Sequence, residues 1–324
     1  MSSVAVTTIG DAVIDCFLHI NNPSQFCKFN SETHELVLES GSKILVDDAS
    51  FLLGGNASNV AVGLTRLGFA TALCAELGDD EFKEKIIKAL THEQVGQTLL
   101  VETKGAQSTF SVVIDIKGER TLFVHHVVRE HELPVKDIQS EWIYLTSLGE
   151  KWETLYKDVL SHAKKQNSRI AFNPGSTQLK RGRESFIDVL PQTEILFVNR
   201  EEGEEILYGK ILMQDKKEDP KHMLFQLQHL GAKIIVMTDG GNGAYAMDEK
   251  GNYYKQKVIP VTIVEKTGAG DAFSTGFLGA ILSGKSLEEA LQWGAQESAS
   301  VMQFVGAQHG LLQKHVLEER IRTL

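Results

Sequence analysis

A carboxylate and a run of small residues stand together near the end of the chain, in a combination that could handle a phosphate. Residues 266–271 read Lys-Thr-Gly-Ala-Gly-Asp. Apolar residues then recur at helical spacing through positions 273–281, which predicts a helix that begins near Gly268. Backbone N–H groups at a helix start bind anions when no bulky side chains shield them. Asp271 beside such a site suits a hydroxyl that loses its proton while it gains a phosphoryl group.

Asp271 also has a simpler interpretation. An acidic residue in the first turn of a helix is stabilised by the helix dipole, and glycines make tight turns. In that position the carboxylate is expected to stay ionised. Ahead of the motif, the Val and Ile residues between positions 258 and 264 predict a buried strand, so Asp271 would follow a strand-to-helix turn. The rest of the sequence decides between the two interpretations.

Length, composition and charge limit the possible functions. The chain has 324 residues and 42% hydrophobic content, enough for one large α/β unit, so residues 1–324 are treated as a single domain. The net charge of −10 argues against nucleic acid or an anionic membrane as a partner. The spacing of Cys16, Cys27 and Cys74 predicts reduced thiols. No segment resembles a signal peptide or a membrane span, so we expect a cytoplasmic protein.

Short apolar segments alternate with amphipathic helices along most of the chain. Strands are predicted at 4–9, 71–75, 143–146, 170–172, 195–198 and 234–238, with helices between them. Continuous apolar strands between amphipathic helices predict a parallel sheet that is covered on both faces. Two amphipathic β regions, near 16–50 and 107–128, predict a small accessory sheet, and residues 117–119 give a hairpin signal.

Well-known phosphate-binding signatures are absent or stand in the wrong context. Residues 279–286, Gly-Ala-Ile-Leu-Ser-Gly-Lys-Ser, match G-x-x-x-x-G-K-[ST], but they follow a predicted helix rather than a strand, which argues against a P-loop. There is no H-R-D or D-F-G set, which excludes a protein kinase. No G-x-G-x-x-G follows a predicted strand, so the dinucleotide fingerprint is missing too. A nucleotide would have to be held in another way.

Four motifs in a fixed order resemble the ribokinase-like (PfkB-type) carbohydrate kinases. They are Gly-Asp at 10–11, Gly-Gly-Asn at 54–56, Asn-Arg-Glu-Glu at 199–202 and Thr-Gly-Ala-Gly-Asp at 267–271. The resemblance extends from about Gly10 to the turn at 306–307. It implies a three-layer α/β/α fold with a central, mostly parallel sheet and a small β lid, formed here by 16–50 and 107–128. It also implies ATP-dependent phosphorylation of a sugar hydroxymethyl group.

The resemblance implies roles on the sugar side of the site. Asp271 would be the general base, and the backbone N–H groups of Gly268, Ala269 and Gly270 would form an anion hole. The sugar would be bound by Asp11, Asp15, Gly54, Gly55, Asn56 and Asn59. The aspartates alternatively cap turns, and the asparagines alternatively belong to a plain helix start. Many relatives carry Lys where this chain has Asn56, which favours a neutral sugar over a sugar phosphate.

On the nucleotide side, the resemblance implies an ATP site and two metal ions. ATP would be lined by Asn199, Thr238, Gly240 and Gly243 and covered by a helix at 290–304. Asn199 and Glu202 would position Mg²⁺ through water, although this spacing is also a capping box. Relatives often place an acidic residue before the glycine motif to bind a monovalent cation. Here Glu265 could hold K⁺, or the ammonium group of Lys266 could replace it.

The resemblance leaves several functions open. The sugar could be ribose, fructose or a keto-deoxy sugar acid. A nucleoside kinase of the same fold is an alternative, because nucleosides also present a ribose hydroxymethyl group. A catalytically silent, sugar-binding regulator would bind sugar without turnover. In many family members the lid strands also pair two subunits, so a homodimer through the lid is a further expectation.

Overall fold

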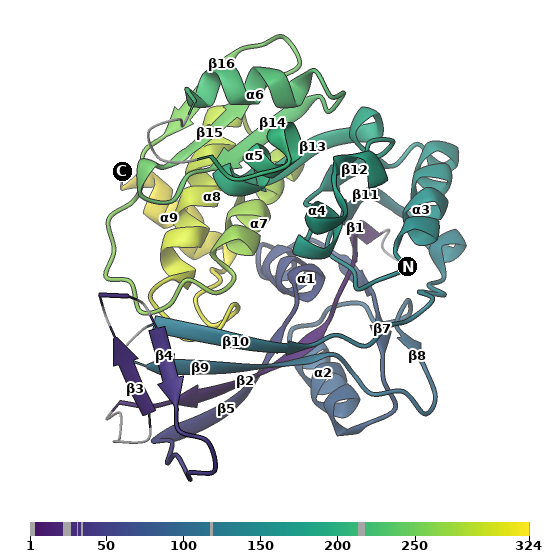
Figure 1. The fold of residues 1–324 in the computed structure, drawn as a ribbon. Helices are drawn as coiled ribbons and strands as arrows, with labels where there is room; N and C mark the ends of the chain where they lie inside the picture. The colour runs from purple at the N-terminus through teal and green to yellow at the C-terminus, as the bar shows by residue number, and fades with distance from the viewer. Residues whose placement is uncertain are drawn as a thin grey trace.

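A mostly parallel sheet forms the centre of the protein (Figure 1). The computed structural model describes residues 4–21, 27–30, 32–33, 35–116, 119–212 and 218–323. The eight strands follow the order β16-β15-β14-β13-β12-β11-β1-β6, with β15 and β16 antiparallel at one edge. Their bounds are β1 Val4–Ile9, β6 Thr71–Cys74, β11 Ser140–Leu145, β12 Arg169–Phe172, β13 Thr193–Asn199, β14 Ile234–Thr238, β15 Ala244–Met247 and β16 Tyr253–Gln256.

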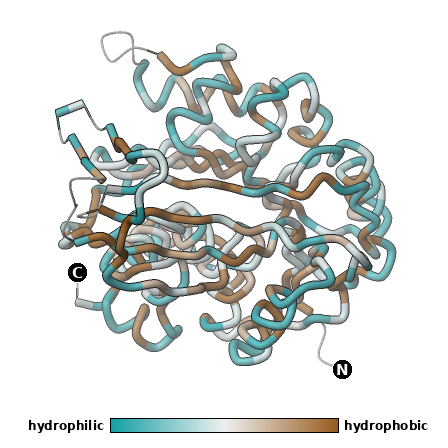
Figure 2. Tube along the Cα trace, turned by 60° about the horizontal axis from the view of Figure 1, so that its bottom comes forward, coloured by the Kyte–Doolittle hydropathy of each residue, from teal (hydrophilic) through white to brown (hydrophobic). Residues whose placement is uncertain are grey.

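Helices cover both faces of this sheet, which confirms the predicted three-layer fold (Figure 1). One face carries α1 Asn56–Arg66, α7 Ala269–Leu282, α8 Leu287–Val301 and α9 Lys314–Arg322. The other carries α3 Glu153–Gln166, α4 Ser176–Arg181, α5 Arg200–Tyr208 and α6 Pro220–Gln228. Helix α2, Glu81–His92, packs beside α1. Hydrophobic residues follow the buried strands and inner helix faces (Figure 2).

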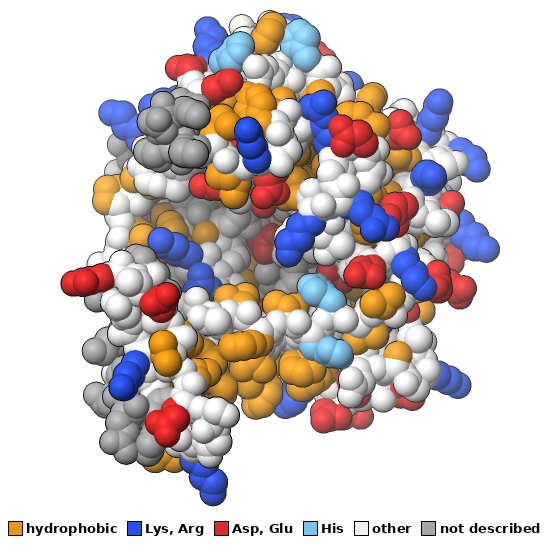
Figure 3. Space-filling model, viewed as in Figure 1, with side chains coloured by type: hydrophobic (Ala, Val, Ile, Leu, Met, Phe, Trp, Pro, Cys, Tyr) orange, Lys and Arg blue, Asp and Glu red, His pale blue; other side chains and the backbone are white. Residues whose placement is uncertain are grey.

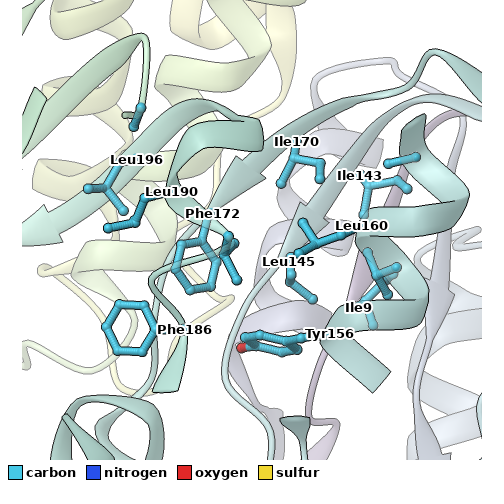
Figure 4. Packing of buried hydrophobic residues seen from close by; sticks show 14 of the residues in the cluster. Ile9, Ile143, Leu145, Tyr156, Leu160, Ile170, Phe172, Phe186, Leu190 and Leu196 are labelled. Atoms are coloured by element: carbon cyan, nitrogen blue, oxygen red, sulfur yellow. The ribbon is translucent and has the colours of Figure 1, made fainter. Parts of the chain in front are cut away.

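Aromatic side chains fill the core on both faces. On the α3 face, Tyr156 packs edge-on against Phe172, and Phe172 packs edge-on against Phe186 (Figure 4). On the α7 face, Phe197 of the sheet meets Phe277 of α7 edge to face, with ring centroids 5.5 Å apart. Such edge contacts are the geometry that the ring quadrupoles favour. The contact between Phe197 and Phe277 anchors α7, whose first turn carries the glycine motif, against the central strands.

A separate four-stranded sheet, called the second sheet here, lies beside the central body (Figure 1). Its order is β10-β9-β2-β5, with bounds β2 Val13–His19, β5 Asp48–Gly54, β9 Phe110–Ile116 and β10 Glu119–His125. The strands β9 and β10 pair antiparallel as the hairpin signal predicts, although residues 117–118 of the turn lie outside the described residues. Shorter pairs are β3 Cys27–Asn30 with β4 Glu35–Leu38, and β7 Glu76–Leu77 with β8 Val101–Glu102.

The buried strand predicted ahead of the glycine motif is wrong. Residues 258–264 follow β16 without strand pairing, and Val258 is 44% exposed and Ile263 52% exposed. Pro260 lacks the N–H group that a strand in the sheet interior would donate. The apolar residues that suggested a strand instead include Val258, Ile259 and Ile263, which line a pocket described below. Among the described residues, no helix is long and apolar enough to cross a membrane.

Candidate active site

Asp271 lies in the first turn of α7, where the sequence predicts it. The residue before the helix, Gly268, has a φ of +73°, a left-handed conformation that a side chain disfavours. A Cβ atom at Gly268 would also lie only 2.4 Å from the Cβ of Ala307. Space at Gly270 is open by contrast, with no heavy atom within 4 Å of the position that a Cβ would take. The glycines therefore have two different roles, since one permits the turn and the other keeps the helix start accessible.

The helix start presents backbone donors toward this open space. Among the described residues, the N–H groups of Gly270 and Asp271 make no backbone hydrogen bond, as expected for the first turn of a helix. The N–H of Ala269 donates to the carbonyl oxygen of Lys266 over 3.2 Å. The donors without a backbone partner can bind an anion, and the helix dipole favours negative charge there.

A hydrogen-bonded relay orients the Asp271 carboxylate. Asn59 of α1 donates from Nδ2 to Oδ2 of Asp271 over 2.8 Å. The other end of the same amide, Oδ1 of Asn59, accepts from Nε2 of Gln308 over 2.9 Å. Gln308 thus fixes which end of the Asn59 amide faces the carboxylate. Sequence analysis missed Gln308, whose only signal was its position directly after the turn at 306–307.

Burial changes the acid–base character of Asp271. Removal from water raises the pKa of this carboxyl to about 7, with the hydrogen bond from Asn59 opposing the rise and the charge of Asp15 adding to it. The expectation of an always ionised carboxylate, drawn from the helix dipole alone, is therefore wrong for this state of the protein. A pKa near neutrality suits a general base.

Two adjoining cavities open beside Asp271. The first, of about 250 Å³, is lined by residues from the strand ends and the glycine motif, among them Asn56, Asn199, Glu202, Thr238 and Asp271. The second, of about 460 Å³, is mostly apolar. Thr238, Lys266, Ala269, Gly270 and Phe273 line both cavities. Figure 3 shows this face of the molecule hollowed between the second sheet and the central body.

Asn199 and Glu202 form the capping box that their spacing allows, and they also line the first cavity. Oδ1 of Asn199 accepts from the Glu202 backbone N–H over 2.8 Å, and Oε2 of Glu202 accepts from the Asn199 N–H over 2.8 Å. Burial raises the pKa of Glu202 to about 7, and the charge of Asp271 contributes to the rise. The negative charge of Asp271 thus opposes ionisation of Glu202. The capping-box interpretation of this pair does not exclude the Mg²⁺ interpretation, because both side chains also line the cavity.

The aspartates after the first strand are held by serines. Ser111 of β9 donates to Oδ1 of Asp15, and Ser147 donates to Oδ2 of Asp11 over 3.3 Å. Any side chain at position 54 would clash within the protein, because a Cβ there would lie 2.0 Å from Oδ2 of Asp15. Burial raises the pKa of both aspartates. Ser111 and Ser147 were not identified from the sequence, where nothing marks a serine as a carboxylate partner.

Gly55 carries the chain past the Asp11 backbone. It has a φ of +93°, and a Cβ there would lie 2.4 Å from the Asp11 carbonyl oxygen. Helix α1 begins immediately afterwards at Asn56. The glycine pair therefore brings Asn56 and Asn59 close to the residues that follow β1.

The second cavity is built from a glycine turn and an apolar helix face. Gly240 and Gly243 contribute from the turn after β14, and Ala295, Ala299 and Met302 contribute from α8 and the residue after it. A buried ion pair steadies the turn, because Nε of Arg200 lies 2.9 Å from Oδ2 of Asp239. The helix predicted at 290–304 to cover a base is α8, at Leu287–Val301.

Glu265 is buried, at 4% exposure, and is held by protein groups on both of its carboxylate oxygens. Oε1 accepts from Nη1 of Arg120 over 2.6 Å and from the hydroxyl of Thr267. Oε2 accepts from the backbone N–H of Gly306 over 2.5 Å. Lys266 is exposed and lies at the junction of the two cavities. Sequence analysis did not identify Arg120, which is distant in the chain and carries no motif.

A match to a protein family shows to which family the chain belongs. The sequence matches the pfkB family carbohydrate kinases over residues 24–314. The chain belongs to this family. A pfkB kinase is a phosphotransferase that acts on sugars. Three of the four motifs fall within the matched range, and Gly-Asp at 10–11 precedes it.

Individual relatives agree with this assignment. The chain is 28% identical over 262 residues to an uncharacterized sugar kinase of Archaeoglobus fulgidus, covering 77% of this chain and 98% of the relative. It is 26% identical over 302 residues to a 5-dehydro-2-deoxygluconokinase of Clostridium beijerinckii, covering 87% of each. The fold resembles the Arabidopsis thaliana ribokinase complexed with ribose and ATP, with a TM-score of 0.77, 19% identity and 98% coverage of both chains. The nucleoside kinase of Methanocaldococcus jannaschii has a TM-score of 0.76 at 20% identity, with both chains fully covered.

Proposed function

We propose that this pfkB kinase transfers the γ-phosphoryl group of ATP to the hydroxymethyl group of a small sugar or sugar acid, with Asp271 as the general base. The observation that carries the proposal is the position of a buried carboxylate, with a pKa near 7, beside the donors of a helix start. A hydroxyl between them would lose its proton to Asp271 as its oxygen attacks the phosphorus. General-base assistance is worth about 10²–10⁴-fold in rate.

ATP fits the two adjoining cavities. Its adenine would occupy the larger, mostly apolar cavity against Ala295, Ala299 and Met302 of the α8 region, and its phosphates would reach the first cavity beside Gly270. Lys266 lies where the two cavities join and would contact the phosphates. Thr238, Gly240 and Gly243 would line the path between base and phosphates, as the sequence predicts.

Mg²⁺ is compatible with the residues at the first cavity. Asn199 and Glu202 supply the amide and carboxylate oxygens that this ion prefers, and the capping box engages only one of the two Glu202 carboxylate oxygens. When bound, the ion would neutralise charge on the transferring phosphates. The protein's own part is to hold the half-buried Glu202 in the same cavity as Asp271, where a cation would favour the ionised form of both carboxyl groups.

The second sheet would act as the lid over the sugar. Asp15 lies on β2 and accepts a hydrogen bond from Ser111 of β9, so this sheet would bring a carboxylate to the sugar. Asp11, Asn56 and Asn59 would complete the sugar contacts from the central body. A lid of this kind would exclude water, so that ATP is not hydrolysed in place of phosphorylating the sugar.

A keto-deoxy sugar acid is the first substrate class to test. Relatives that match this chain include several named 5-dehydro-2-deoxygluconokinase. Burial raises the pKa of Asp11 at the substrate end of the site, and the nearby His126, His131 and Arg129 oppose that rise. His126 is exposed and available to a carboxylate of the substrate. Ribose, fructose and nucleosides remain in the panel as alternatives.

A homodimer through the second sheet is also part of the proposal. Leu122, Phe123 and Val124 of the edge strand β10 are each about half exposed, as is Phe51 of β5. Exposed apolar groups on an edge strand favour pairing with another strand. Sedimentation of the full chain, and of a variant with Phe123→Lys on this strand, would detect such a dimer and its loss.

The experiment for the proposed function is ADP release with ATP and Mg²⁺ over a panel of keto-deoxy sugar acids, pentoses, hexoses and nucleosides. Turnover of a sugar or sugar acid supports the proposal. Turnover of nucleosides alone would assign the protein to the nucleoside kinases of this fold. Sugar binding by calorimetry without turnover of any compound would identify a silent regulator and overturn the proposal.

A further inference from the structure

An arginine from the second sheet reaches the loop that carries the anion-binding motif. Arg120 lies on β10, and its Nη1 donates to Oε1 of Glu265 over 2.6 Å. The two side chains are 18% and 4% exposed, so the ion pair is largely withdrawn from water. Glu265 lies just before the Thr-Gly-Ala-Gly-Asp motif and is separated from Arg120 by 145 positions in sequence. The contact joins the second sheet to the start of α7.

Two further protein donors also bind the Glu265 carboxylate, so that each of its oxygens has a protein partner. Thr267 donates its hydroxyl to Oε1, and the backbone N–H of Gly306 donates to Oε2 over 2.5 Å. A cation bound to this carboxylate would have to displace the guanidinium group or crowd against it. The residues present therefore do not fit the monovalent ion that relatives place at this acidic position.

We propose that the guanidinium group of Arg120 permanently takes the place of that monovalent cation, and that it couples the second sheet to the catalytic loop. The inference rests on the proposed function for its effect on catalysis, although the ion pair itself does not. Arg120 is a positioning residue, because it acts on the reacting groups through Glu265. An arginine suits the role, since its guanidinium stays protonated throughout the accessible pH range.

Two branches lead from Glu265 to the reacting groups. In the first branch, Glu265 accepts a hydrogen bond from Thr267, which directly precedes Gly268 and the turn into α7. Through Gly306 it holds the turn that leads to Gln308, and Gln308 orients Asn59 against Asp271.

The same turn is tied down from its other side. Arg66 donates from Nη1 to the carbonyl oxygens of Gln308 and Leu311 over 2.7 and 3.0 Å. It also forms a paired ion contact with Glu93, over 2.9 and 2.7 Å. The turn at 306–311 is therefore held on one side by Arg66 and on the other by Glu265, which is paired with Arg120 of the second sheet.

The charge of Arg120 also affects the pKa of Asp15, on the sugar side of the site. Its charge lowers the pKa of Asp15, whereas the charge of Glu265 raises it. Asp15, Glu265 and Arg120 thus form one electrostatic group across the hollow between the second sheet and the central body. Loss of the arginine would leave two carboxylates facing each other, a pair that a free cation would then stabilise.

The first test needs no turnover. The melting temperature is measured in KCl, NaCl and tetramethylammonium chloride at equal ionic strength for the wild type, Arg120→Ala and Arg120→Lys. We expect the wild type to melt at the same temperature in all three salts. Arg120→Ala should melt lower and should regain stability specifically in K⁺ or Na⁺, because an ion that binds only the folded state stabilises it. Arg120→Lys should lie between them.

The matched control is Arg169→Ala, which removes an exposed arginine paired with Glu141 on the central sheet. It should melt alike in the three salts. Specific stabilisation of the wild type by K⁺, as large as that of Arg120→Ala, would overturn the proposal. So would an Arg120→Ala variant that shows no salt-specific stabilisation.

The second test uses the turnover assay. Arg120→Ala should lower kcat by roughly tenfold to a hundredfold, because the anion hole and the base lose their alignment. Ethylguanidinium at tens of millimolar, or K⁺, should restore part of this loss and should leave Arg169→Ala unchanged. Retention of full kcat in Arg120→Ala would overturn the coupling. If no compound is turned over by the wild type, the proposed function fails, and the melting test still decides the role of Arg120.

Discussion

Asn59 and Asp271 are 212 positions apart in sequence, and their side chains are joined by a hydrogen bond of 2.8 Å. Asn59 is 4% exposed and Asp271 9% exposed. The bond places a buried amide donor on the carboxylate proposed as the general base. Because Gln308 holds the far end of the amide, the donor end cannot exchange with the acceptor end without loss of a second bond. The protein thus limits how far burial raises the pKa of its base.

The decrease of kcat/KM at acidic pH, the acid limb of the pH profile, should reflect protonation of Asp271. With the pKa of Asp271 at about 7, kcat/KM should fall as the pH drops below 7, because the protonated carboxyl cannot accept the sugar proton. Glu202 has a pKa of about 7 as well, so the measured limb belongs to the pair. The measurement is kcat/KM at limiting Mg²⁺, because a bound cation would lower both pKa values, over a pH range from about 5.5 to about 9. A flat profile across neutrality would contradict the assignment.

Asn59→Leu should shift that limb toward higher pH. The hydrogen bond from Asn59 lowers the pKa of Asp271, so its removal raises the pKa further. At high pH, where Asp271 is ionised in both proteins, the activities of variant and wild type should converge. Gln308→Leu is the graded companion, because it frees the amide without removing it, and it should shift the limb less. A limb that stays in place in Asn59→Leu would show that the bond does not tune the base.

Alanine substitutions at the two glycines of the motif should have different effects on stability and on activity. Gly268→Ala meets Ala307 at 2.4 Å and has a positive φ, so it should lower the free energy of unfolding by about 2–4 kcal/mol. Gly270→Ala has open space and helical surroundings, so it should be neutral or stabilising by up to about 1 kcal/mol. Its methyl group should nevertheless block the phosphate position and abolish turnover. Urea unfolding and the ADP assay measure the two effects, and equal destabilisation of both variants would refute the distinction.

A buried carboxyl away from the reacting groups should govern stability at high pH. Glu297 of α8 has no exposed surface, and burial raises its pKa to about 8. Its neutral form stabilises the fold fully below the ordinary pKa of 4.5, and that stability is lost as the pH rises through 8. Glu297→Gln keeps an acceptor for the Leu312 N–H, which bonds Glu297 over 3.1 Å, and should remove the loss.

The corresponding measurement is the free energy of unfolding at pH 6 and pH 9 for Glu297→Gln and for the exposed control Glu288→Gln. The advantage of Glu297→Gln over the wild type should grow from pH 6 to pH 9 by about 3 kcal/mol, because about two pH units lie between pH 6 and the pKa of about 8. An advantage that is independent of pH would mean that the carboxyl does not ionise in the folded protein over this range.

His126 should distinguish acidic from neutral substrates. It is exposed and lies near Asp11 at the substrate end of the site. His126→Ala should raise KM for a keto-deoxy sugar acid at pH 6 and leave KM for a neutral sugar unchanged. The neighbouring His125, which packs on Phe110 with ring centroids 5.5 Å apart, supplies the matched control as His125→Ala. Equal effects of the two variants on both substrate classes would remove His126 from substrate recognition.

The sequence predicts the fold because strands and helices follow local patterns, and a local pattern also marks Asp271. The roles expected of Asn199 and Thr238 rested on the resemblance to a family, and all three residues line the first cavity. The strand prediction for 258–264 failed because an apolar run that lines a cavity has the same composition as a buried strand. Only Pro260 distinguished the two.

The partners of the site residues could not be predicted in the same way. Ser111, Gln308 and Arg120 carry no motif, and each meets its carboxylate or amide across a long stretch of chain. The pKa of Asp271 depends on burial by several elements at once, which local sequence does not reveal. The spacing of Asn199 and Glu202 did predict their capping box, although it could not show that the capping box also lines a cavity.

Asp271→Asn tests the central claim most directly. Asparagine keeps the size of the side chain and an oxygen for the Asn59 donor, so the variant should fold, bind ATP and bind the sugar as the wild type does. Single-turnover phosphorylation of the identified substrate should then be slower by about 10²–10⁴-fold, since the base is gone. Wild-type chemistry in a folded, substrate-bound Asp271→Asn protein would contradict the assignment of Asp271 as the general base.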